Sequence, residues 1–484
     1  MRISVIYDDT VKKNDVIADI IGGRGFADIV VKNKRLEEYY REAVLRLFPD
    51  LEWRKIHSSF EYAGMAQELD KYLNEDVRFL HCFSNYRIAD EDKALLSYEK
   101  IKYIEEPFAA LDGNRVVAVM FPDAPSYMSF CKEVASGQKT WDAAKSIKNS
   151  FEMDGVIDIG IVGNFISCIT GNIDLRYFNS LRGNEYTLVK SSANKKKIKS
   201  EYSFFHLLPE DMKMWFVMPF NYQEKGDTAS YTMERLYMTD LAVKWVHGSM
   251  DEEEFEKIMD KYFFFLTSRH SRPCTSEIRE KNAKALYVDK VISRIEELKA
   301  MPQYLKIQKT LDMSDELSLD SLTEKYCDLK NKIEARNRYP LIEVIGHGDL
   351  CFANTMYNKS TQTLKFIDPR GALTEEDLWT DQYYDVAKLS HSVCGRYDFF
   401  NHALFSIGIN ENFSLTLNVP FDNSKYVSIF RRKAEENAFD FLTIRIYEAS
   451  LFLSMLPLHM DKPYKVLGFI LNANNILKEI EKDV

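Results

Sequence analysis

The chain has 484 residues, of which 45% are hydrophobic and 29% are charged, with 19 Gly and 13 Pro. This composition excludes large-scale disorder, and the length exceeds what one ordinary hydrophobic core requires, so two or three domains are expected. The formal net charge of −10 argues against a general nucleic-acid binder, which usually carries a basic surface.

The amino-terminal residues and the cysteines bear on the cellular compartment. The first residues lack the basic region and the long apolar region of a signal peptide, and no apolar stretch is long enough to span a bilayer. The seven cysteines show no CxxC spacing, which favours reduced thiols over a zinc site or a disulfide framework. A cytoplasmic protein without a transmembrane segment is expected, and its oligomeric state is left open.

Residues 1–145 predict an α/β domain. Apolar residues recur at helical spacing over 36–47, and residues 77–82 and 115–121 are typical of strands. Such alternation favours a largely parallel sheet. The glycine-rich segment 21–25 resembles the nucleotide-binding loop of sugar-phosphate nucleotidyltransferases, but residues 8–20 separate it from the first strand. A nucleotidyltransferase-like or glycosyltransferase-like module is one expectation, and an ordinary glycine-rich turn is the other.

Residues 155–245 predict an antiparallel meander followed by a helix and two more strands. Turn-forming pairs at Gly171-Asn172 and Gly183-Asn184 separate the first strands. Helical periodicity then covers residues 198–208. The predicted strands are residues 166–169, 173–178, 186–190, 215–219 and 231–236.

From about residue 246 to 484 the chain is predicted to be mainly helical. A strand over 341–345 runs into a polar loop, and strands over 355–357 and 364–367 form a hairpin. This arrangement brings the side chains of Asp349, Asn354 and Asp368 to one end of the hairpin.

These three side chains suit phosphoryl transfer. That reaction needs a cation on the phosphates and an acceptor for the proton of the attacking hydroxyl, with little covalent chemistry from the protein. Mg²⁺ prefers oxygen ligands and retains waters, so the Asp368 carboxylate and the Asn354 amide form a sensible partial shell. Asp349 then accepts or orients the substrate hydroxyl. The alternative is a turn in which His347 and Asp349 only cap backbone groups.

The segments HGDLCFANTMYN and FIDPRG resemble the catalytic and metal-binding loops of the aminoglycoside-phosphotransferase and choline-kinase-like family, which has the protein-kinase fold. The resemblance covers residues 155–480 and is closest to bacterial members associated with capsule or surface-polysaccharide biosynthesis. It implies ATP and Mg²⁺ as cofactors, Asp349 as catalytic base, and Asn354 and Asp368 as magnesium ligands. It also implies that His347 braces the backbone of the loop.

The same resemblance implies a lysine and an acidic partner that position the nucleotide. Lys190 ends the predicted strand 186–190, and Glu201 follows on the predicted helix. An ammonium held near the α- and β-phosphates is electrostatically favourable. Surface lysines and glutamates are common, however, so an ordinary pair is the alternative.

The nucleotide-binding segments are less distinctive. The family binds adenine through the backbone of a segment that corresponds here to Met233, Glu234 and Leu236. Packing in the hydrophobic core explains the apolar residues equally well. Gly171 falls where a loop would cover the phosphates, but the repeated glycines of such loops are missing, and an ordinary turn is the alternative.

Two residues flank the metal-binding segment. Asp385, at the start of a predicted helix, matches the family residue that braces the catalytic loop, although the helix dipole alone favours an acidic residue there. Arg370 is a candidate for contacting a phosphate or an acidic substrate, with a surface ion pair as the alternative.

The sequence therefore predicts an α/β domain at 1–145 followed by a two-lobed, protein-kinase-like α+β domain. A small antiparallel sheet lobe is expected at 155–245 and a helical lobe at 246–484. The expected enzyme is a small-molecule kinase acting on a hydroxyl of a sugar, amino alcohol or related metabolite, in surface-polysaccharide biosynthesis. The alternatives are a pseudokinase scaffold and a bifunctional protein whose first domain has its own activity.

Overall fold

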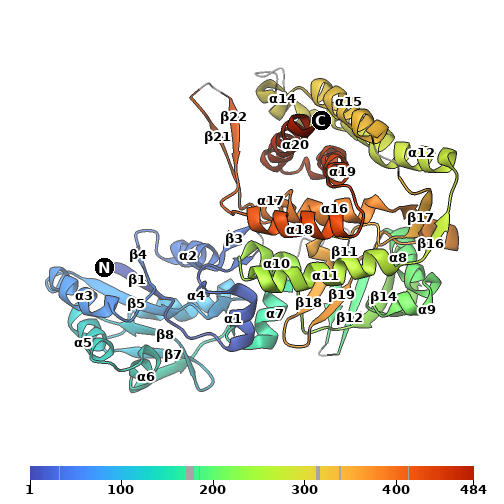
Figure 1. Ribbon diagram of the computed structural model, residues 1–484. Coiled ribbons are helices and arrows are strands. Elements are labelled where there is room, and N and C mark those ends of the chain that lie inside the picture. Colours follow the sequence, from blue (N-terminus) through green and yellow to red (C-terminus); the bar gives the residue numbers. More distant parts are fainter. Residues whose placement is uncertain (32, 171–178, 185, 312–316, 337–338, 412–413) are drawn as a thin grey trace. The chain divides into compact units, whose positions relative to one another are not determined.

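The computed structural model describes residues 1–31, 33–170, 179–184, 186–311, 317–336, 339–411 and 414–484. The chain divides into two compact units, Met1–Ile173 and Asp174–Val484 (Figure 1). Residues 155–170, which the sequence placed at the start of the following lobe, therefore belong to the first unit. The cause is local pairing, because strand β9 (Asn149–Glu152) joins the sheet of the first unit and β10 (Val156–Asp158) pairs with β6 (Tyr86–Ile88).

The first unit contains a six-stranded sheet in the order β4-β1-β5-β8-β7-β9. β1 pairs in parallel with β4 and β5, whereas β8 is antiparallel to both β5 and β7. The sheet is thus mixed rather than largely parallel, because a short turn makes β7 and β8 a hairpin. The other strands of the sheet are β1 (Arg2–Asp8), β4 (Glu52–Ile56), β5 (Val77–Phe83), β7 (Phe108–Asp112) and β8 (Arg115–Phe121).

Seven α-helices belong to the described part of the first unit. Helix α7 (Val162–Thr170) includes residues 166–169, which the sequence predicted as a strand, and that prediction is wrong. Phe165, Ile166 and Ile169 are buried together, a spacing that places them on one helical face. The remaining helices are α1 (Asp15–Ile21), α2 (Leu36–Leu47), α3 (Glu61–Glu68), α4 (Glu91–Glu99), α5 (Ala124–Ala135) and α6 (Thr140–Lys145), and a hairpin joins β2 (Val30–Val31) to β3 (Lys34–Arg35).

The second unit begins with an antiparallel sheet in the order β11-β12-β14-β13. Helix α8 (Lys195–Leu207) follows β12 directly and contacts β13 and β14, so that this sheet and helix form one layer pair. Asn194 caps α8 by accepting from the Lys197 amide at 3.0 Å. The strands are β11 (Asn179–Gly183), β12 (Thr187–Ser192), β13 (Pro219–Lys225) and β14 (Thr228–Glu234), and α9 (Glu210–Lys213) lies between α8 and β13.

The predicted strand 215–219 is displaced in the structure. β13 begins only at Pro219, a residue that is tolerated at the start of a strand because it has no amide hydrogen. Residues 215–217 instead run beside β19 (Thr363–Phe366), where the Phe366 amide donates to the Trp215 carbonyl at 2.7 Å. The segment therefore connects the antiparallel sheet to the hairpin that carries the polar loop.

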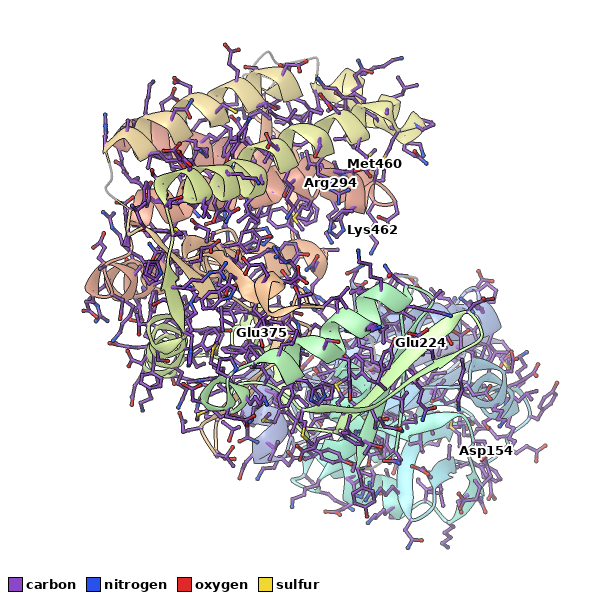
Figure 2. All side chains as sticks on the ribbon, turned by 90° about the vertical axis from the view of Figure 1, so that its right-hand side faces the viewer. Asp154, Glu224, Arg294, Glu375, Met460 and Lys462 are labelled. Carbon is purple, nitrogen blue, oxygen red and sulfur yellow. The ribbon has the colours of Figure 1, made fainter. Side chains whose placement is uncertain are left out.

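The remainder of the second unit is mainly helical, and most of its buried apolar residues form one core. Figure 2 shows the side chains of the described residues, including Arg294 and Lys462 in this helical part. It also labels Glu224, which lies on β13. No helix in the described residues is long and apolar enough to cross a membrane. The helices are α10 (Leu241–Val246), α11 (Glu252–Ser268), α12 (Ser276–Lys284), α13 (Lys290–Ala300), α14 (Leu305–Leu311), α15 (Leu319–Arg336), α16 (Tyr383–Val393), α17 (Tyr397–Asn401), α18 (Ser424–Glu436), α19 (Phe441–Ser454) and α20 (Pro463–Asp483).

Three small antiparallel sheets interrupt these helices. The predicted hairpin is present, since β18 (Thr355–Asn358) pairs with β19 in a register that sets Thr355 opposite Phe366. The predicted strand 341–345 is present as β17 (Ile342–Ile345). The further strands are β15 (Thr239–Asp240), which pairs with β18, β16 (Ser271–Pro273) and β20 (Trp379–Asp381), which flank β17, and β21 (Ser406–Ile409) with β22 (Leu415–Asn418).

Candidate active site

The loop that joins β17 to β18 lies against the segment that follows β19. Gly348 in this loop has a φ of +79°, in the left-handed region that favours glycine. A Cβ on Gly348 would lie 2.6 Å from the Cβ of Arg370. The Arg370 amide also donates to the His347 carbonyl at 2.9 Å. A residue with a side chain at position 348 would push the two segments apart, so the glycine permits their close approach.

Asp349, Asn354 and Asp368 meet at one end of the β18–β19 hairpin. Nδ2 of Asn354 donates to the Asp349 carbonyl at 2.9 Å and to Oδ2 of Asp349 at 3.0 Å. The amide of Ile367, the residue before Asp368, donates to the Asn354 carbonyl at 3.0 Å. The Asp349 and Asp368 side chains are 44% and 40% exposed. Both carboxylates are therefore held in place and still accessible to a ligand.

Lys190 connects this end of the hairpin to helix α8. Its Nζ lies 2.8 Å from Oε2 of Glu201 and 2.7 Å from Oδ1 of Asp368. Lys190 and Glu201 are each only 2% exposed, and Tyr231 donates to the same Glu201 oxygen at 3.1 Å. Burial works against the charged lysine, but the Asp368 and Glu201 carboxylates outweigh it and raise the pKa of Lys190. The ammonium is thus charged and fixed between two carboxylates.

Asp368 itself has a strained backbone. Its φ of +56° is uncommon for a residue other than glycine and costs on the order of 1–3 kcal/mol. Gly371, three residues later, has a φ of +92°, and a Cβ there would lie 2.8 Å from the backbone carbon of Ser200. The Ala372 amide donates to the Ser200 carbonyl at 3.0 Å. Because Ser200 precedes Glu201, these contacts fix the acidic partner of Lys190 relative to Asp368.

His347 links the loop before β18 to the segment after β19. Its Nε2 donates to the Ile367 carbonyl at 3.0 Å, and its Nδ1 accepts from the Asp349 amide at 3.1 Å. Burial lowers the pKa of His347, more strongly than the nearby Asp385 and Asp349 raise it. A neutral imidazole with both nitrogens engaged in this way connects the two backbone segments.

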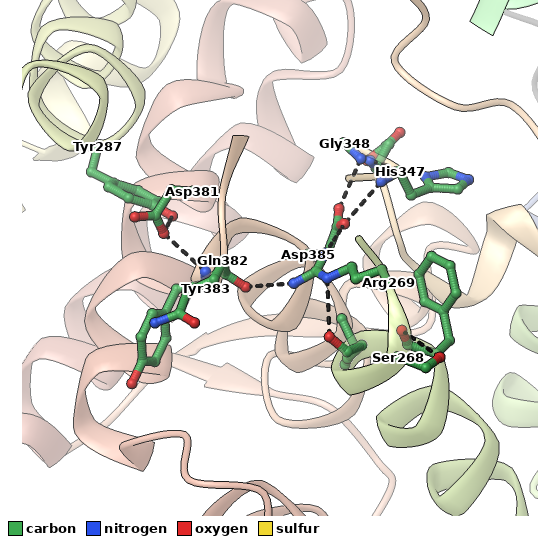
Figure 3. Close-up of polar contacts among 12 residues, drawn as sticks. Ser268, Arg269, Tyr287, His347, Gly348, Asp381, Gln382, Tyr383 and Asp385 are labelled. Carbon is green, nitrogen blue, oxygen red and sulfur yellow. Dashed lines mark hydrogen bonds and ion pairs between the residues drawn. The ribbon is translucent and has the colours of Figure 1, made fainter. Parts of the chain in front are cut away.

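Asp385 lies in the first turn of α16, beneath the loop that carries Asp349 (Figure 3). Its carboxylate accepts from the amides of His347 at 2.9 Å and Gly348 at 2.8 Å. Nη1 of Arg269 donates to it at 2.7 Å, and Nη2 of Arg269 donates to the Gln382 carbonyl at 2.8 Å. Asp385 and Arg269 are almost completely buried, so the loop rests on an internal ion pair.

The sequence did not single out Arg269 or Lys388. Nζ of Lys388, on α16, lies 2.9 Å from Oδ1 of Asp349. Burial lowers the stability of its charged form, but the Asp349 carboxylate more than compensates and raises the pKa of Lys388. The spacing of three from Asp385 puts both residues on one face of α16 and could have indicated Lys388. No sequence pattern indicated Arg269, because it lies directly after α11, 116 residues before its partner Asp385.

Of the residues expected to contact the nucleotide, Met233 lies next to this cluster. Met233 and Glu234 are the last residues of β14, and Leu236 follows in the connection to β15. Met233 lines a small pocket together with Glu201 and Asp368. The roles of Glu234 and Leu236 remain predictions.

Two other predicted residues are less well defined. Gly171 lies outside the described residues. Arg370 is exposed beside Asp368, and its backbone amide is the group already bonded to the His347 carbonyl. The roles assigned to both residues remain predictions.

The donor set at the hairpin end suits a hard divalent cation. Both hydrogen bonds of Asn354 use Nδ2, which leaves its Oδ1 as a potential ligand. Asp368 uses Oδ1 for Lys190, which leaves Oδ2. Among the described residues, no group of three or more His, Cys, Asp or Glu side chains could hold a metal alone. An amide and a carboxylate oxygen, completed by phosphate and water, fit Mg²⁺.

No protein-family model and no curated protein matches the chain. Among solved structures, it is similar to a thermostable mutant of aminoglycoside phosphotransferase APH(4)-Ia in ternary complex with ADP and hygromycin B, with 11% identity and a TM-score of 0.37, covering 65% of this chain and 97% of that chain. It is also similar to choline kinase from Cryptosporidium parvum Iowa II, with 11% identity and a TM-score of 0.32, covering 67% and 96%. The streptomycin–ATP–APH(2″)-IIa ternary complex matches at 14% identity and a TM-score of 0.32, covering 63% and 92%. These TM-scores are too low for the likenesses to indicate the activity of this chain.

Proposed function

We propose that this protein is an ATP- and magnesium-dependent kinase that transfers the γ-phosphate to a hydroxyl of a small molecule. The observation that carries the proposal is the convergence of Asp349, Asn354 and Asp368 with the buried Lys190–Glu201 pair. Phosphoryl transfer depends on positioning and charge stabilisation, and this cluster offers a hydroxyl-orienting carboxylate, two oxygen ligands and a fixed ammonium.

Each residue has a distinct proposed role. Asp349 accepts a hydrogen bond from the acceptor hydroxyl and orients it for attack, and its exposed carboxylate is accessible for this purpose. Lys190, held by Glu201, contacts the α- and β-phosphates. Asn354 and Asp368 would hold Mg²⁺, which when bound neutralises charge on the phosphates. Asp385 and His347 do not contact substrate in this scheme but hold the loop that positions Asp349.

The connection after β14 is the proposed adenine site. Backbone groups near Met233, Glu234 and Leu236 would bind the base, with apolar side chains against the ring. Arg370 is proposed to contact a phosphate or an acidic group of the acceptor. The two-lobed arrangement is proposed on the same basis, with the cleft between the antiparallel sheet and the helices.

The proposal is tested with Asp349→Asn. ADP release from MgATP is measured with a sugar, an amino alcohol and an aminoglycoside as acceptors, and ATP binding is measured separately. Turnover is expected to fall at least about 1000-fold, because the uncharged amide is a poor acceptor, while ATP binding persists. Asp320→Asn is the matched control, since Asp320 forms an exposed ion pair on α15. Near-normal turnover by Asp349→Asn would refute the proposed role.

A pseudokinase scaffold is the alternative from a different functional class. The polar residues of the loop are all present and held by hydrogen bonds, which favours an active enzyme. Absence of any magnesium-dependent stabilisation by nucleotide, measured by thermal unfolding of the purified protein, would favour the scaffold.

A bifunctional protein is the other alternative, in which the first unit acts on a nucleotide or nucleotide-sugar. Asp8 ends β1 and Asp9 follows it, at the carboxyl edge of the parallel strands, and a Cβ on Gly25 would overlap the Asp9 carboxylate. Ligands of open α/β sheets often bind at this edge. The full chain would then be expected to bind a nucleoside triphosphate at a second site that survives Asp349→Asn and Lys190→Met. The surface-polysaccharide context and the cytoplasmic location remain predictions from the sequence.

A further inference from the structure

Lys388 occupies an unusual position for a lysine. Its side chain is 17% exposed, and its Nζ lies 2.9 Å from Oδ1 of Asp349. The other Asp349 oxygen, Oδ2, accepts from Nδ2 of Asn354 at 3.0 Å. The two oxygens of the Asp349 carboxylate therefore each contact a donor, one from helix α16 and one from the loop before β18.

We propose that Lys388 is a positioning residue of the active site, which holds the Asp349 carboxylate in the orientation that receives the acceptor hydroxyl. This inference rests on the proposed kinase function and adds to it a residue outside the recognised motifs. It also gives helix α16 two separate tasks, since Asp385 supports the loop backbone and Lys388 orients the reactive side chain.

Stability alone does not account for this pair. Asp349 is 44% exposed, and an ion pair with a half-exposed partner contributes little to folding. Placing most of a lysine side chain out of water has a desolvation cost. Arg269 and Asp385 differ, because both are buried and the carboxylate also accepts two backbone amides. Because burying Lys388 has a desolvation cost and its partner Asp349 is exposed, a functional role explains the pair better than a contribution to folding.

The other titratable groups near the pair do not replace Lys388 as the positive charge. His347 contacts the Asp349 backbone, and His391 lies one turn beyond Lys388 on α16. Burial lowers the pKa of both imidazoles, so they are neutral near pH 7. Tyr384, which accepts from Lys290 at 3.1 Å, and the buried thiol of Cys351 complete the surroundings. Among these groups, Lys388 is therefore the cation that contacts the Asp349 carboxylate.

The test compares full-length wild type with Lys388→Met and Lys388→Arg. Lys330→Met is the matched control, because Lys330 is also a mostly buried lysine paired with a carboxylate, Glu334 at 2.7 Å, but lies on α15. Each protein is assayed by ADP release from MgATP, with glucose, ethanolamine and kanamycin as acceptor probes. The KM for ATP and the thermal unfolding midpoint are measured in parallel.

For Lys388→Met we expect a fall in kcat on the order of 100-fold with a KM for ATP within about threefold of wild type. Its unfolding midpoint should equal or exceed that of wild type, and Lys388→Arg should restore most of kcat. An unchanged kcat in Lys388→Met would overturn the inference, as would a fall in its unfolding midpoint as large as that of Lys330→Met. If wild type transfers phosphate to no acceptor and hydrolyses no ATP, the kinase proposal itself fails and this inference falls with it.

Discussion

The site contains two kinds of carboxylate that differ in how far their side chains are exposed. Asp385 is completely buried and accepts from two backbone amides and the Arg269 guanidinium. Asp349 and Asp368 are 44% and 40% exposed, and each has a lysine on one oxygen. A buried carboxylate bonded to several internal donors supports the structure, whereas an exposed carboxylate can receive a hydroxyl or a cation. The difference separates the group that holds the loop from the groups proposed to react.

Asp368→Asn is expected to have the largest effect on activity among the exposed carboxylates. Removing the charge of a proposed metal ligand is expected to reduce turnover at least about 1000-fold, or about 4 kcal/mol in activation free energy. The free energy of unfolding should change by less than about 1 kcal/mol, because Asp368 is 40% exposed and Lys190 keeps Glu201. Turnover is measured by ADP release and unfolding by urea titration. A large loss of stability with retained turnover would reverse the assignment.

Asp385→Ala is expected to act in the opposite way. It leaves Arg269 buried without its carboxylate and two loop amides without an acceptor, so the free energy of unfolding should fall by about 4 kcal/mol. Urea titration measures the loss, and Arg432→Ala, which removes exposed ion pairs on α18, serves as control. A stability within 1 kcal/mol of wild type would contradict a supporting role for this residue.

Asp398 provides a third case, a carboxylate as buried as Asp385 but without comparable compensation. Burial raises its pKa to about 7, with a smaller contribution from Asp240. The folded protein therefore retains a proton that the unfolded chain loses at its usual value of 3.8, and the stability of wild type falls as the pH rises toward 7. Asp398→Asn removes this pH-dependent contribution to the free energy of unfolding. Its stability relative to wild type should increase by about 2 kcal/mol between pH 5 and pH 8, as measured by urea titration at each pH. A constant difference across this range would rule out the titration of Asp398.

Gly371→Ala tests how the segment after Asp368 positions α8. The added Cβ meets the Ser200 backbone, and φ of +92° is unfavourable for alanine, so a destabilisation of about 1–3 kcal/mol is expected. Because Glu201 follows Ser200, the KM for ATP should rise as well. Gly113→Ala, in the first unit, has a positive φ but open space around its Cβ and controls for the conformational term. An unchanged KM for ATP would show that the contact between Gly371 and Ser200 has no role in nucleotide binding.

Local patterns predicted the hairpin, the strand before it and the acidic start of α16, because each depends on nearby residues. They also brought Asp349, Asn354 and Asp368 together, since a two-stranded hairpin leaves few alternatives. The strand predicted over 166–169 was wrong because a short apolar run fits either period, and its burial pattern is helical. The start of β13 was misplaced because residues 215–217 pair with β19, far along the chain.

Contacts between distant segments explain the remaining omissions. Arg269 and Asp385 are 116 residues apart, and Lys190 and Asp368 are 178 residues apart. Motif order indicated the second pair, but nothing near Arg269 marks it as the partner of a buried carboxylate. Lys388 contacts Asp349 only because α16 packs beneath the loop. Such pairings are set by tertiary packing, which a single sequence does not display.

The most direct test of the central claim is calorimetric titration of ATP into wild type and Asp368→Asn, with and without Mg²⁺. It requires no knowledge of the acceptor. The account predicts that wild type binds ATP much more tightly with Mg²⁺ and that Asp368→Asn loses most of this dependence. Failure of wild type to bind ATP, or binding that is indifferent to Mg²⁺ in both proteins, would contradict it.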